Sequence, residues 1–451
     1  MTSKNRAGGI LTKVVCAVAV GVLAAGGAFA QEEGQPEQKT KQAQAVSKSV
    51  YDKILKAQEE IDAENYKEAL SMLNRLLGQT KPALTEYEQI NVLNYIGFVQ
   101  FSQEDTAGAV RTYKQLLAIP SLEVQMRKQT LYTLAQLSTM EEQYGEALKL
   151  LDEWFTIETN PQPDAYILYA QNLYQMSRYA DMVKPIETAM SVAREKDKEV
   201  KEDWYTLLNF AYFQQENYAK VRDIQKILLV NWPKKRYWFS LAGAYTELGE
   251  EANLLHAYNA AHTQGMLEKE AELVTMAQLY MQHEVPYKAG ALLEKEMEAG
   301  RVSKSGKNYR LLSQAWSLAA EDGKAIPALQ AAARLSDDGE LDVRLGNAYL
   351  NLGRYGECVS AVKSGLGKGG VKSPDNAQIS LGMCLYNQKK YNDAIKAFRE
   401  AGRTNRSRRL ADQWIKVINS DLERDEQIRL AERAARKQQE ELAKKRETSR
   451  T

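Results

Sequence analysis

The residues that could perform chemistry are few and widely spaced. The three histidines are His256, His262 and His283, and none lies four residues from another or close in sequence to a cysteine. Zinc sites need such spacings. No serine lies in the G-x-S-x-G turn of hydrolases. The sequence therefore predicts no catalytic residue, no metal and no cofactor, and we interpret the histidines as helix-surface residues.

One glycine-rich segment has the spacing of a nucleotide-binding motif. Residues 365–370 are Gly-Leu-Gly-Lys-Gly-Gly, which matches G-x-G-x-x-G. That motif binds a pyrophosphate only between a strand and a helix, where backbone amides face the phosphates. Here the segment follows a helical pattern and leads into Ser373-Pro374. We therefore expect a long flexible loop between two structural repeats.

The N-terminus has the pattern of a secretory signal peptide. Lys4, Arg6 and Lys13 accompany an apolar stretch, and Ala28-Phe29-Ala30 is a small-x-small cleavage motif. The apolar stretch is short for a transmembrane helix, which takes about 20 residues. We expect residues 1–30 to be removed after Ala30, which leaves no stable transmembrane segment.

The charge argues against two classes of partner. Loss of the three basic signal residues changes the formal net charge from +1 to −2. A nearly neutral protein has no general attraction to nucleic acid or to an anionic membrane. We therefore expect no nucleic-acid partner.

Two cysteines remain after cleavage, Cys358 and Cys384. An exported protein can form a disulfide, but the spacing of these two residues does not by itself support one. We interpret both as buried thiols that act as small apolar residues, with a disulfide as the alternative.

The rest of the chain repeats one pattern of large, small and aromatic residues. Leu345-Gly346 precedes Tyr349, and Leu381-Gly382 precedes Leu385. A small residue beside a large one lets two antiparallel helices approach closely, and the pattern resembles the tetratricopeptide repeat (TPR). The aligned small positions on the first helix are Ala57, Gly97, Ala135, Ala170, Asn209, Ala242, Ala277, Ser313, Gly346 and Gly382. The aromatic on the second helix recurs as Tyr66, Tyr144, Tyr179, Tyr218, Tyr287, Tyr355 and Tyr391.

This pattern predicts an all-α fold, a TPR helix-turn-helix solenoid that forms a right-handed superhelix of about ten repeats. The expected organisation is a signal peptide (1–30), a disordered polar linker (31–47), the TPR array (48–404), a capping helix (405–419) and a charged helical tail (420–451). Gly249, Gly323 and Gly353 lie near the turns between paired helices, where a left-handed residue ends the first helix.

The first helices of such repeats line an inner groove, and the position after each small residue should face it. Of the nine residues that follow the small positions from Gly97 to Gly382, five are amides, which can pair with a peptide bond regardless of its side chain. Other inward positions carry aromatics, which give a large contact area. The predicted partner-binding groove consists of Phe98, Phe101, Tyr132, Gln136, Gln171, Tyr174, Phe210, Phe213, Phe239, Gln278, Gln314, Asn347 and Tyr386. The alternative is that several of these side chains only pack against neighbouring helices.

The layout of the whole chain resembles exported bacterial TPR proteins that accompany TonB–ExbB–ExbD energy-transduction systems. The resemblance rests on the signal peptide, the Gln-rich linker, Tyr66-Lys67-Glu68-Ala69-Leu70, Asn94-Tyr95-Ile96-Gly97-Phe98 and the charged tail. It implies a periplasmic, non-catalytic scaffold whose partners are TonB- or ExbB-type components or an outer-membrane receptor for nutrients or metal chelates.

Two other classes of function remain open. TPR arrays also serve as adaptors in envelope-assembly, pilus or secretion complexes, and the fold alone does not separate these roles. An enzyme or ligand-binding protein is a third class, which the missing site residues disfavour.

Overall fold

The computed structural model describes residues 46–448, with side chains up to Ala443. The predicted signal peptide, its cleavage site and most of the predicted linker lie outside these residues, so their assignments stay predictions.

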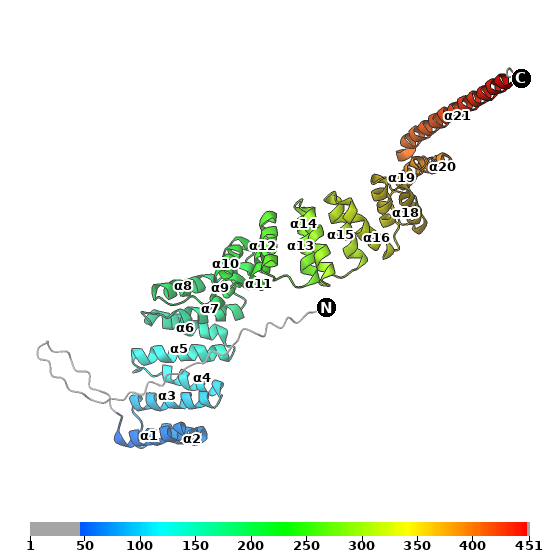
Figure 1. The fold of residues 1–451 in the computed structure, drawn as a ribbon. Helices are drawn as coiled ribbons and strands as arrows, with labels where there is room; N and C mark the ends of the chain where they lie inside the picture. The colour runs from blue at the N-terminus through cyan, green and yellow to red at the C-terminus, as the bar shows by residue number, and fades with distance from the viewer. Residues whose placement is uncertain (1–45, 449–451) are drawn as a thin grey trace. The chain divides into compact units, whose positions relative to one another are not determined.

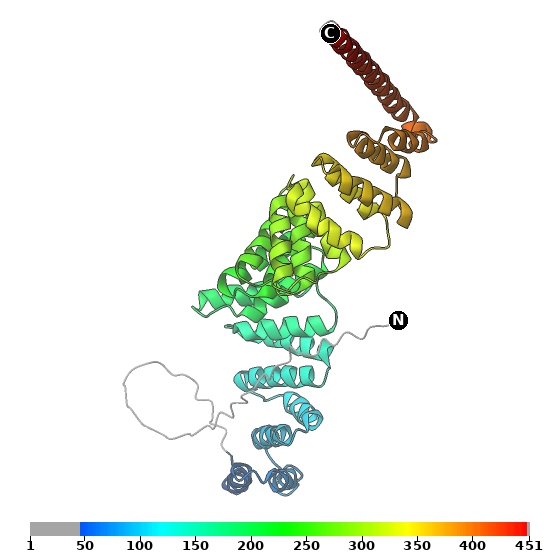
Figure 2. The same cartoon turned by 45° about the vertical axis from the view of Figure 1, so that its right-hand side comes forward.

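The described chain consists of helices joined by short turns (Figures 1 and 2). Within it the only extended pairing is an isolated bridge between Thr80 and Ala83. The helices form two compact units, which divide along the sequence between Pro233 and Lys234. Unit 1 contains α1 (Lys48–Asp62), α2 (Tyr66–Leu77), α3 (Glu86–Ser102), α4 (Thr106–Leu117), α5 (Val124–Met140), α6 (Tyr144–Ile157), α7 (Pro163–Gln175), α8 (Val183–Glu195), α9 (Glu202–Gln214) and α10 (Tyr218–Asn231). Unit 2 contains α11 (Lys235–Glu247), α12 (Glu251–Thr263), α13 (Glu270–Gln282), α14 (Pro286–Glu298), α15 (Gly306–Leu318), α16 (Asp322–Arg334), α17 (Glu340–Asn351), α18 (Tyr355–Lys368), α19 (Pro374–Asn387), α20 (Tyr391–Ala401) and α21 (Asn405–Thr448).

The helices pair in sequence order, from α1 with α2 to α19 with α20. The predicted all-α TPR fold, with its ten helix-turn-helix repeats, is confirmed. Each predicted small position lies on the first helix of its pair, and nine of the ten are buried. The exception is Asn209, which is half-buried and whose Oδ1 lacks a hydrogen-bond partner.

The small positions work by letting a large side chain of the second helix touch the first helix. A Cβ added to Gly97 would lie 2.8 Å from the ring of Tyr113, and one added to Gly382 would lie 2.7 Å from Phe398. Tyr113 and Phe398 are themselves buried. The missing side chain at each glycine thus leaves the space in which the aromatic ring of the second helix packs.

The turns inside the ten repeats share one geometry. In each, the N–H that follows a left-handed residue donates to a carbonyl five residues back, for example Gln143 to Ser138 at 2.8 Å. This is the Schellman arrangement. Gly249 and Gly353 are left-handed as predicted, but the prediction for Gly323 is wrong, because Gly323 lies in α16 and Ala320 is the left-handed residue of that turn. The ten left-handed residues are Glu64, Glu104, Glu142, Ser177, Glu216, Gly249, Glu284, Ala320, Gly353 and Lys389.

At the opposite ends of the first helices, carboxylates join neighbouring repeats. Glu270 at the start of α13 accepts hydrogen bonds from Ser303 Oγ (2.7 Å) and Asn308 Nδ2 (2.6 Å), which belong to the next repeat. Asp375 in α19 accepts from Ser407 Oγ of α21 at 2.6 Å. These hydroxyl and amide donors lower the pKa values of both carboxyls. We call this set of contacts the inter-repeat seam.

Glu88 of α3 is the most buried carboxylate of the seam, at 4% exposure. Its Oε1 accepts from Ser47 Oγ (2.6 Å) and from the Ser47 N–H (3.0 Å), which precedes α1. Its Oε2 accepts from the N–H of Thr85 (3.0 Å), whose hydroxyl in turn caps α3. The Ser47 hydroxyl is the main cause that lowers the pKa of Glu88 to about 2, against the opposing effect of burial.

We expect Glu88→Gln to destabilise the first helix pair by about 1–2 kcal/mol at neutral pH, because the amide cannot accept all of these bonds. A carboxyl whose pKa is lowered on folding stabilises the fold above its unfolded value near 4.5 and loses that effect as pH falls toward about 2. The protection factors of the α1 amides, which correct for the pH dependence of intrinsic exchange, should therefore fall as pH decreases between these values in the natural protein. An equal fall in Glu88→Gln would contradict this role.

The prediction that Cys358 and Cys384 are free thiols is wrong. The structure joins them in a disulfide between α18 and α19, with both side chains fully buried. The two Cα atoms lie 6.3 Å apart, within the usual range for disulfides. The sequence left the disulfide only as an alternative because the pairing depends on how α18 packs against α19, which the spacing of the two cysteines does not reveal. The bond links the ninth repeat covalently to the tenth.

The segments predicted as a capping helix and a charged tail form one continuous helix, α21, which extends beyond the last pair (Figures 1 and 2). Its first part covers the array, since Ala411 and Ile418 are buried and Trp414 stacks on Phe398 with 5.6 Å between ring centroids. Beyond Leu422 its described side chains are almost all exposed. Ion pairs such as Arg429 with Glu426 at 2.8 Å lie along that part.

Candidate partner-binding surface

The amides predicted to line a groove reach solvent. Gln171, Gln278, Gln314 and Asn347 are exposed and Gln136 is half-buried, although each directly follows a buried small residue. A step of one residue turns a helical side chain by about 100°, away from the helix partner. Among the described residues, none of these amides has a hydrogen-bond partner.

Three of these amides lie on successive first helices of unit 2, namely α13, α15 and α17. The seam holds the starts of these helices together, through Glu270 with Asn308 and through Arg310, whose guanidinium lies 3.9 Å from Asp338. Gln278, Gln314 and Asn347 therefore form a ladder in one register, which we call the amide ladder.

The predicted aromatics are more deeply packed than the amides. Phe98, Phe101, Tyr132, Tyr174, Phe210, Phe239 and Tyr386 are half-buried, and only Phe213 is exposed, at 51%. Tyr132 contacts Trp154 at 5.1 Å between ring centroids, and Phe239 contacts Tyr258 at 5.6 Å. Both contacts lie within one repeat, and each of the predicted aromatic side chains is still partly exposed.

Tyr386 is already covered by the chain itself. Its hydroxyl donates to Asp421 Oδ2 at 2.7 Å and its ring lies 5.3 Å from that of Trp414. Hydrogen bonding to Asp421 raises the pKa of Tyr386. At this position α21 occupies the surface that was predicted for a partner.

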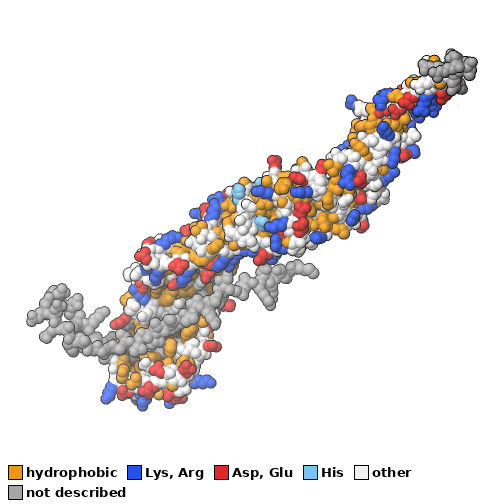
Figure 3. All heavy atoms as spheres, in the orientation of Figure 1, with side chains coloured by type: hydrophobic (Ala, Val, Ile, Leu, Met, Phe, Trp, Pro, Cys, Tyr) orange, Lys and Arg blue, Asp and Glu red, His pale blue; other side chains and the backbone are white. Residues whose placement is uncertain are grey.

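The described residues hold no group of three or more His, Cys, Asp or Glu side chains that could bind a metal. Of the histidines, His256 is exposed, while His262 and His283 are half-buried. Charged side chains of both signs are spread among apolar ones over the surface seen in Figure 3, without one dominant charged face.

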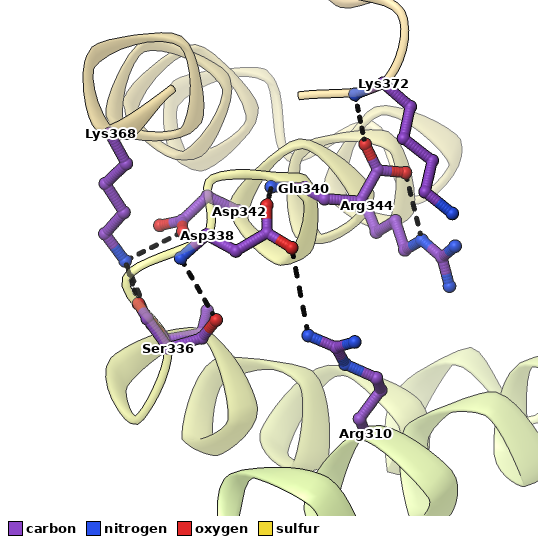
Figure 4. Close-up of polar contacts among 9 residues, drawn as sticks. Arg310, Ser336, Asp338, Glu340, Asp342, Arg344, Lys368 and Lys372 are labelled. Atoms are coloured by element: carbon purple, nitrogen blue, oxygen red, sulfur yellow. Dashed lines mark hydrogen bonds and ion pairs between the residues drawn. The ribbon is translucent and has the colours of Figure 1, made fainter. Parts of the chain in front are cut away.

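The glycine-rich segment is built differently from the prediction of a flexible loop, because α18 continues through Lys368 and only Gly369 and Gly370 are left-handed. Lys368 Nζ donates to the carbonyls of Ala333 (2.9 Å) and Ser336 (3.3 Å) and pairs with Asp342 Oδ2 at 2.8 Å (Figure 4). The lysine caps the C-terminal end of α16, so it does not point to a phosphate site.

The glycines of this segment serve close packing. A Cβ on Gly365 would lie 2.6 Å from the carbonyl oxygen of Gly339, and one on Gly339 would lie 2.0 Å from the oxygen of Gly365. The N–H of Gly339 donates to the carbonyl of Gly369 at 2.9 Å. The start of α17 and the end of α18 thus meet through backbone atoms, which explains the glycines without a nucleotide.

A hollow of about 530 Å³ lies on the surface of α17 and α18. Its lining consists of Leu345, Tyr349, Gly356, Glu357, Ser360 and Ala361. The one charged group, Glu357, pairs with Arg354 at 2.7 Å. The hollow therefore offers little for a small polar ligand to bind.

No family model and no curated protein sequence matches this chain. Solved structures of low sequence identity do match. One is a tetratricopeptide repeat protein from Parabacteroides merdae, 16% identical over 60% of this chain and 99% of that one, with a TM-score of 0.35. Another is YrrB, described as a TPR protein with an unusual peptide-binding site, 19% identical over 42% and 96% of the two chains, with a TM-score of 0.35. A third is the structure of Naa15/Naa10 bound to HypK-THB, 12% identical over 83% and 65%, with a TM-score of 0.41. Matches at these identities and TM-scores do not indicate the function of this chain.

Within residues 46–448, no helix combines the length and the apolar character that a membrane span requires.

Two features of the surface were not predicted from the sequence. The sequence did not predict the inter-repeat seam because its donors and acceptors lie far apart along the chain, as with Ser47 and Glu88. The sequence did not predict that glutamates would adopt the left-handed conformation, because glycine is the residue expected at such turns. Recurrence of Glu at one position of successive repeats, as in Glu104 and Glu142, was the available signal.

Proposed function

We propose that this protein is a non-catalytic, periplasmic scaffold that binds other proteins in TonB-dependent energy transduction or nutrient uptake. The observation that carries the proposal is the amide ladder of Gln278, Gln314 and Asn347, which is exposed, in register and without internal partners. Such a ladder suits the backbone of an extended or helical polypeptide, because each amide offers a donor and an acceptor.

The disulfide supports an exported location. Disulfides persist in oxidising compartments such as the periplasm and are rare in the cytosol. The signal-like residues at the N-terminus agree with export. The TonB assignment rests on the resemblance in layout alone.

Replacing both Gln278 and Gln314 by alanine is expected to weaken partner binding about tenfold without unfolding unit 2, since two exposed amide hydrogen bonds contribute on the order of 1–2 kcal/mol together. Partners would be captured by crosslinking in intact cells and identified by mass spectrometry. The affinity of the captured partner for each variant would then be measured by titration calorimetry.

The matched control is Gln264→Ala with Asn392→Ala, which removes two exposed amides away from the amide ladder. Equal affinity of the ladder variant and the natural protein would refute the ladder as the binding surface. Recovery of TonB- or ExbB-type proteins would support the proposed pathway, whereas recovery of assembly or secretion proteins alone would favour the adaptor role.

A further inference from the structure

Unit 1 exposes apolar side chains where three successive first helices end. Met140 is the last residue of α5, Met176 directly follows α7, and Phe213 is the penultimate residue of α9. Their side chains are 54%, 41% and 51% exposed. Each of them lies one to three residues before the left-handed residue of its turn, so exposed apolar area recurs at three successive turns, as at an interaction surface.

These helix ends lie side by side. Thr139 Oγ1 of α5 donates to Asn172 Oδ1 of α7 at 3.0 Å, and the rings of Tyr174 in α7 and Phe210 in α9 are 5.1 Å apart. Phe213 also contacts Tyr218, with 6.1 Å between centroids. The exposed apolar residues therefore belong to neighbouring helices whose side chains contact one another.

Carboxylates without internal partners accompany this apolar row. Glu104, Glu142 and Glu216 occupy the left-handed positions of turns in unit 1 and are exposed. None of the three carboxylates has an ion-pair or hydrogen-bond partner in the described chain. We call these three glutamates together with Met140, Met176 and Phe213 the turn edge.

Some carboxylates on the opposite edge of unit 1 have partners within the chain. Glu88 accepts from Ser47, Asp164 pairs with Lys201 at 3.1 Å, and Glu158 pairs with Lys128 at 3.4 Å. The carboxylates of the turn edge have no such partner in the described chain and lie near exposed apolar side chains.

We propose that the turn edge of unit 1 binds a cationic amphipathic polypeptide segment, in which Lys or Arg alternates with large apolar residues. Apolar side chains of the segment would cover Met140, Met176 and Phe213, and its cations would pair with the glutamates on either side. Unpaired carboxylates repel nucleic acid and anionic lipid, so a basic polypeptide is the occupant that the charge selects. This specifies one partner class for the proposed scaffold and uses a surface separate from the amide ladder.

The test uses the full chain and three fluorescent peptides of about 18 residues, enough for five helical turns. The first has lysine on one face and leucine on the other, the second has glutamate in place of lysine, and the third has serine in place of leucine. Fluorescence anisotropy at low and high salt should show tight, salt-sensitive binding of the first peptide alone. Binding of the glutamate peptide with equal affinity would overturn the proposal.

Two variants locate the site. The triple change Glu104→Gln, Glu142→Gln and Glu216→Gln should reduce affinity about tenfold and flatten the salt dependence. The double change Met140→Ser and Met176→Ser should reduce affinity about tenfold while the salt dependence remains. Both variants should fold normally, because all five side chains are exposed. Circular dichroism and thermal melting would check this.

The matched control removes three exposed carboxylates from the opposite edge, as Glu123→Gln, Glu199→Gln and Asp203→Asn. It should bind the first peptide as the natural protein does, and an equal loss in this control would overturn the proposal by showing general charge attraction. Gln278→Ala with Gln314→Ala should also bind the peptide normally. Loss of the natural partner in that variant alone would leave the scaffold proposal standing whatever the peptide result.

Discussion

Replacement of Cys358 and Cys384 by alanine is expected to lower the stability of unit 2 by about 3 kcal/mol, because the disulfide closes a loop between residues 26 apart. The bond ties α18 to α19 across a repeat boundary, where each repeat otherwise depends on its neighbour for burial. The last repeat and α21 lie beyond that boundary. We expect them to separate from the array in lower denaturant, which urea unfolding followed by hydrogen exchange would measure.

Unit 1 supplies an internal reference for that experiment. The chain has three cysteines, and the described part of unit 1 contains none of them. Reducing agent should therefore destabilise unit 2 of the natural protein, leave exchange in unit 1 unchanged and have no effect on the double-alanine variant. Non-reducing peptide mapping should recover the peptides of Cys358 and Cys384 as one species. Recovery of two free thiols from protein isolated under oxidising conditions would contradict the pairing.

The fold could be predicted because a TPR unit is encoded over short distances. Gly346 and Tyr349 lie one turn apart on α17 and their roles depend on the adjacent α18, so a pattern of about 34 residues contains nearly all the information. The prediction that Gly323 marks the turn was wrong for a local reason as well. Helix α15 ends before the glycine, because the hydrogen bond from the Glu321 N–H to the Trp316 carbonyl places Ala320 in the left-handed position.

Contacts between repeats were harder to predict. The disulfide and the hydrogen bond between Ser47 and Glu88 join residues whose distance in space depends on how one helix pair stacks on the next. The sequence pattern fixes the pair but not the polar partners across the boundary. Interactions of this kind come from the three-dimensional stacking alone.

The candidate surface likewise has features that the sequence could predict and features that depend on the three-dimensional stacking. The exposure of Gln278 and Gln314 follows from an offset of one residue on a known helix, which the sequence provides. The covering of Tyr386 by α21 depends on where a continuous C-terminal helix lies, which the sequence does not provide. Of the turn edge only Phe213 was predicted, because the glutamates stand where a glycine ordinarily indicates such a turn.

A leucine at Gly346 is expected to destabilise unit 2 by about 3 kcal/mol, although leucine favours helix over glycine by roughly 0.8 kcal/mol. An added Cβ would lie 2.3 Å from Val362 Cγ2 and 3.3 Å from the carbonyl oxygen of Cys358. Val362 is fully buried and β-branched, so it cannot rotate away without opening a gap elsewhere. The helix pair must therefore separate, which disturbs the core around the disulfide.

The same substitution at Gly243 is the matched control, because that glycine also lies inside a first helix of unit 2 but has no atom within 4 Å of an added Cβ. Gly243→Leu should leave stability unchanged or raise it by about 0.5–1 kcal/mol, as helix propensity alone predicts. Opposite shifts of the urea midpoint for the two leucines would show that close helix approach sets the small position. Equal shifts would show that Gly346 is only a helix residue, and the packing basis of the repeat would then be wrong at this pair.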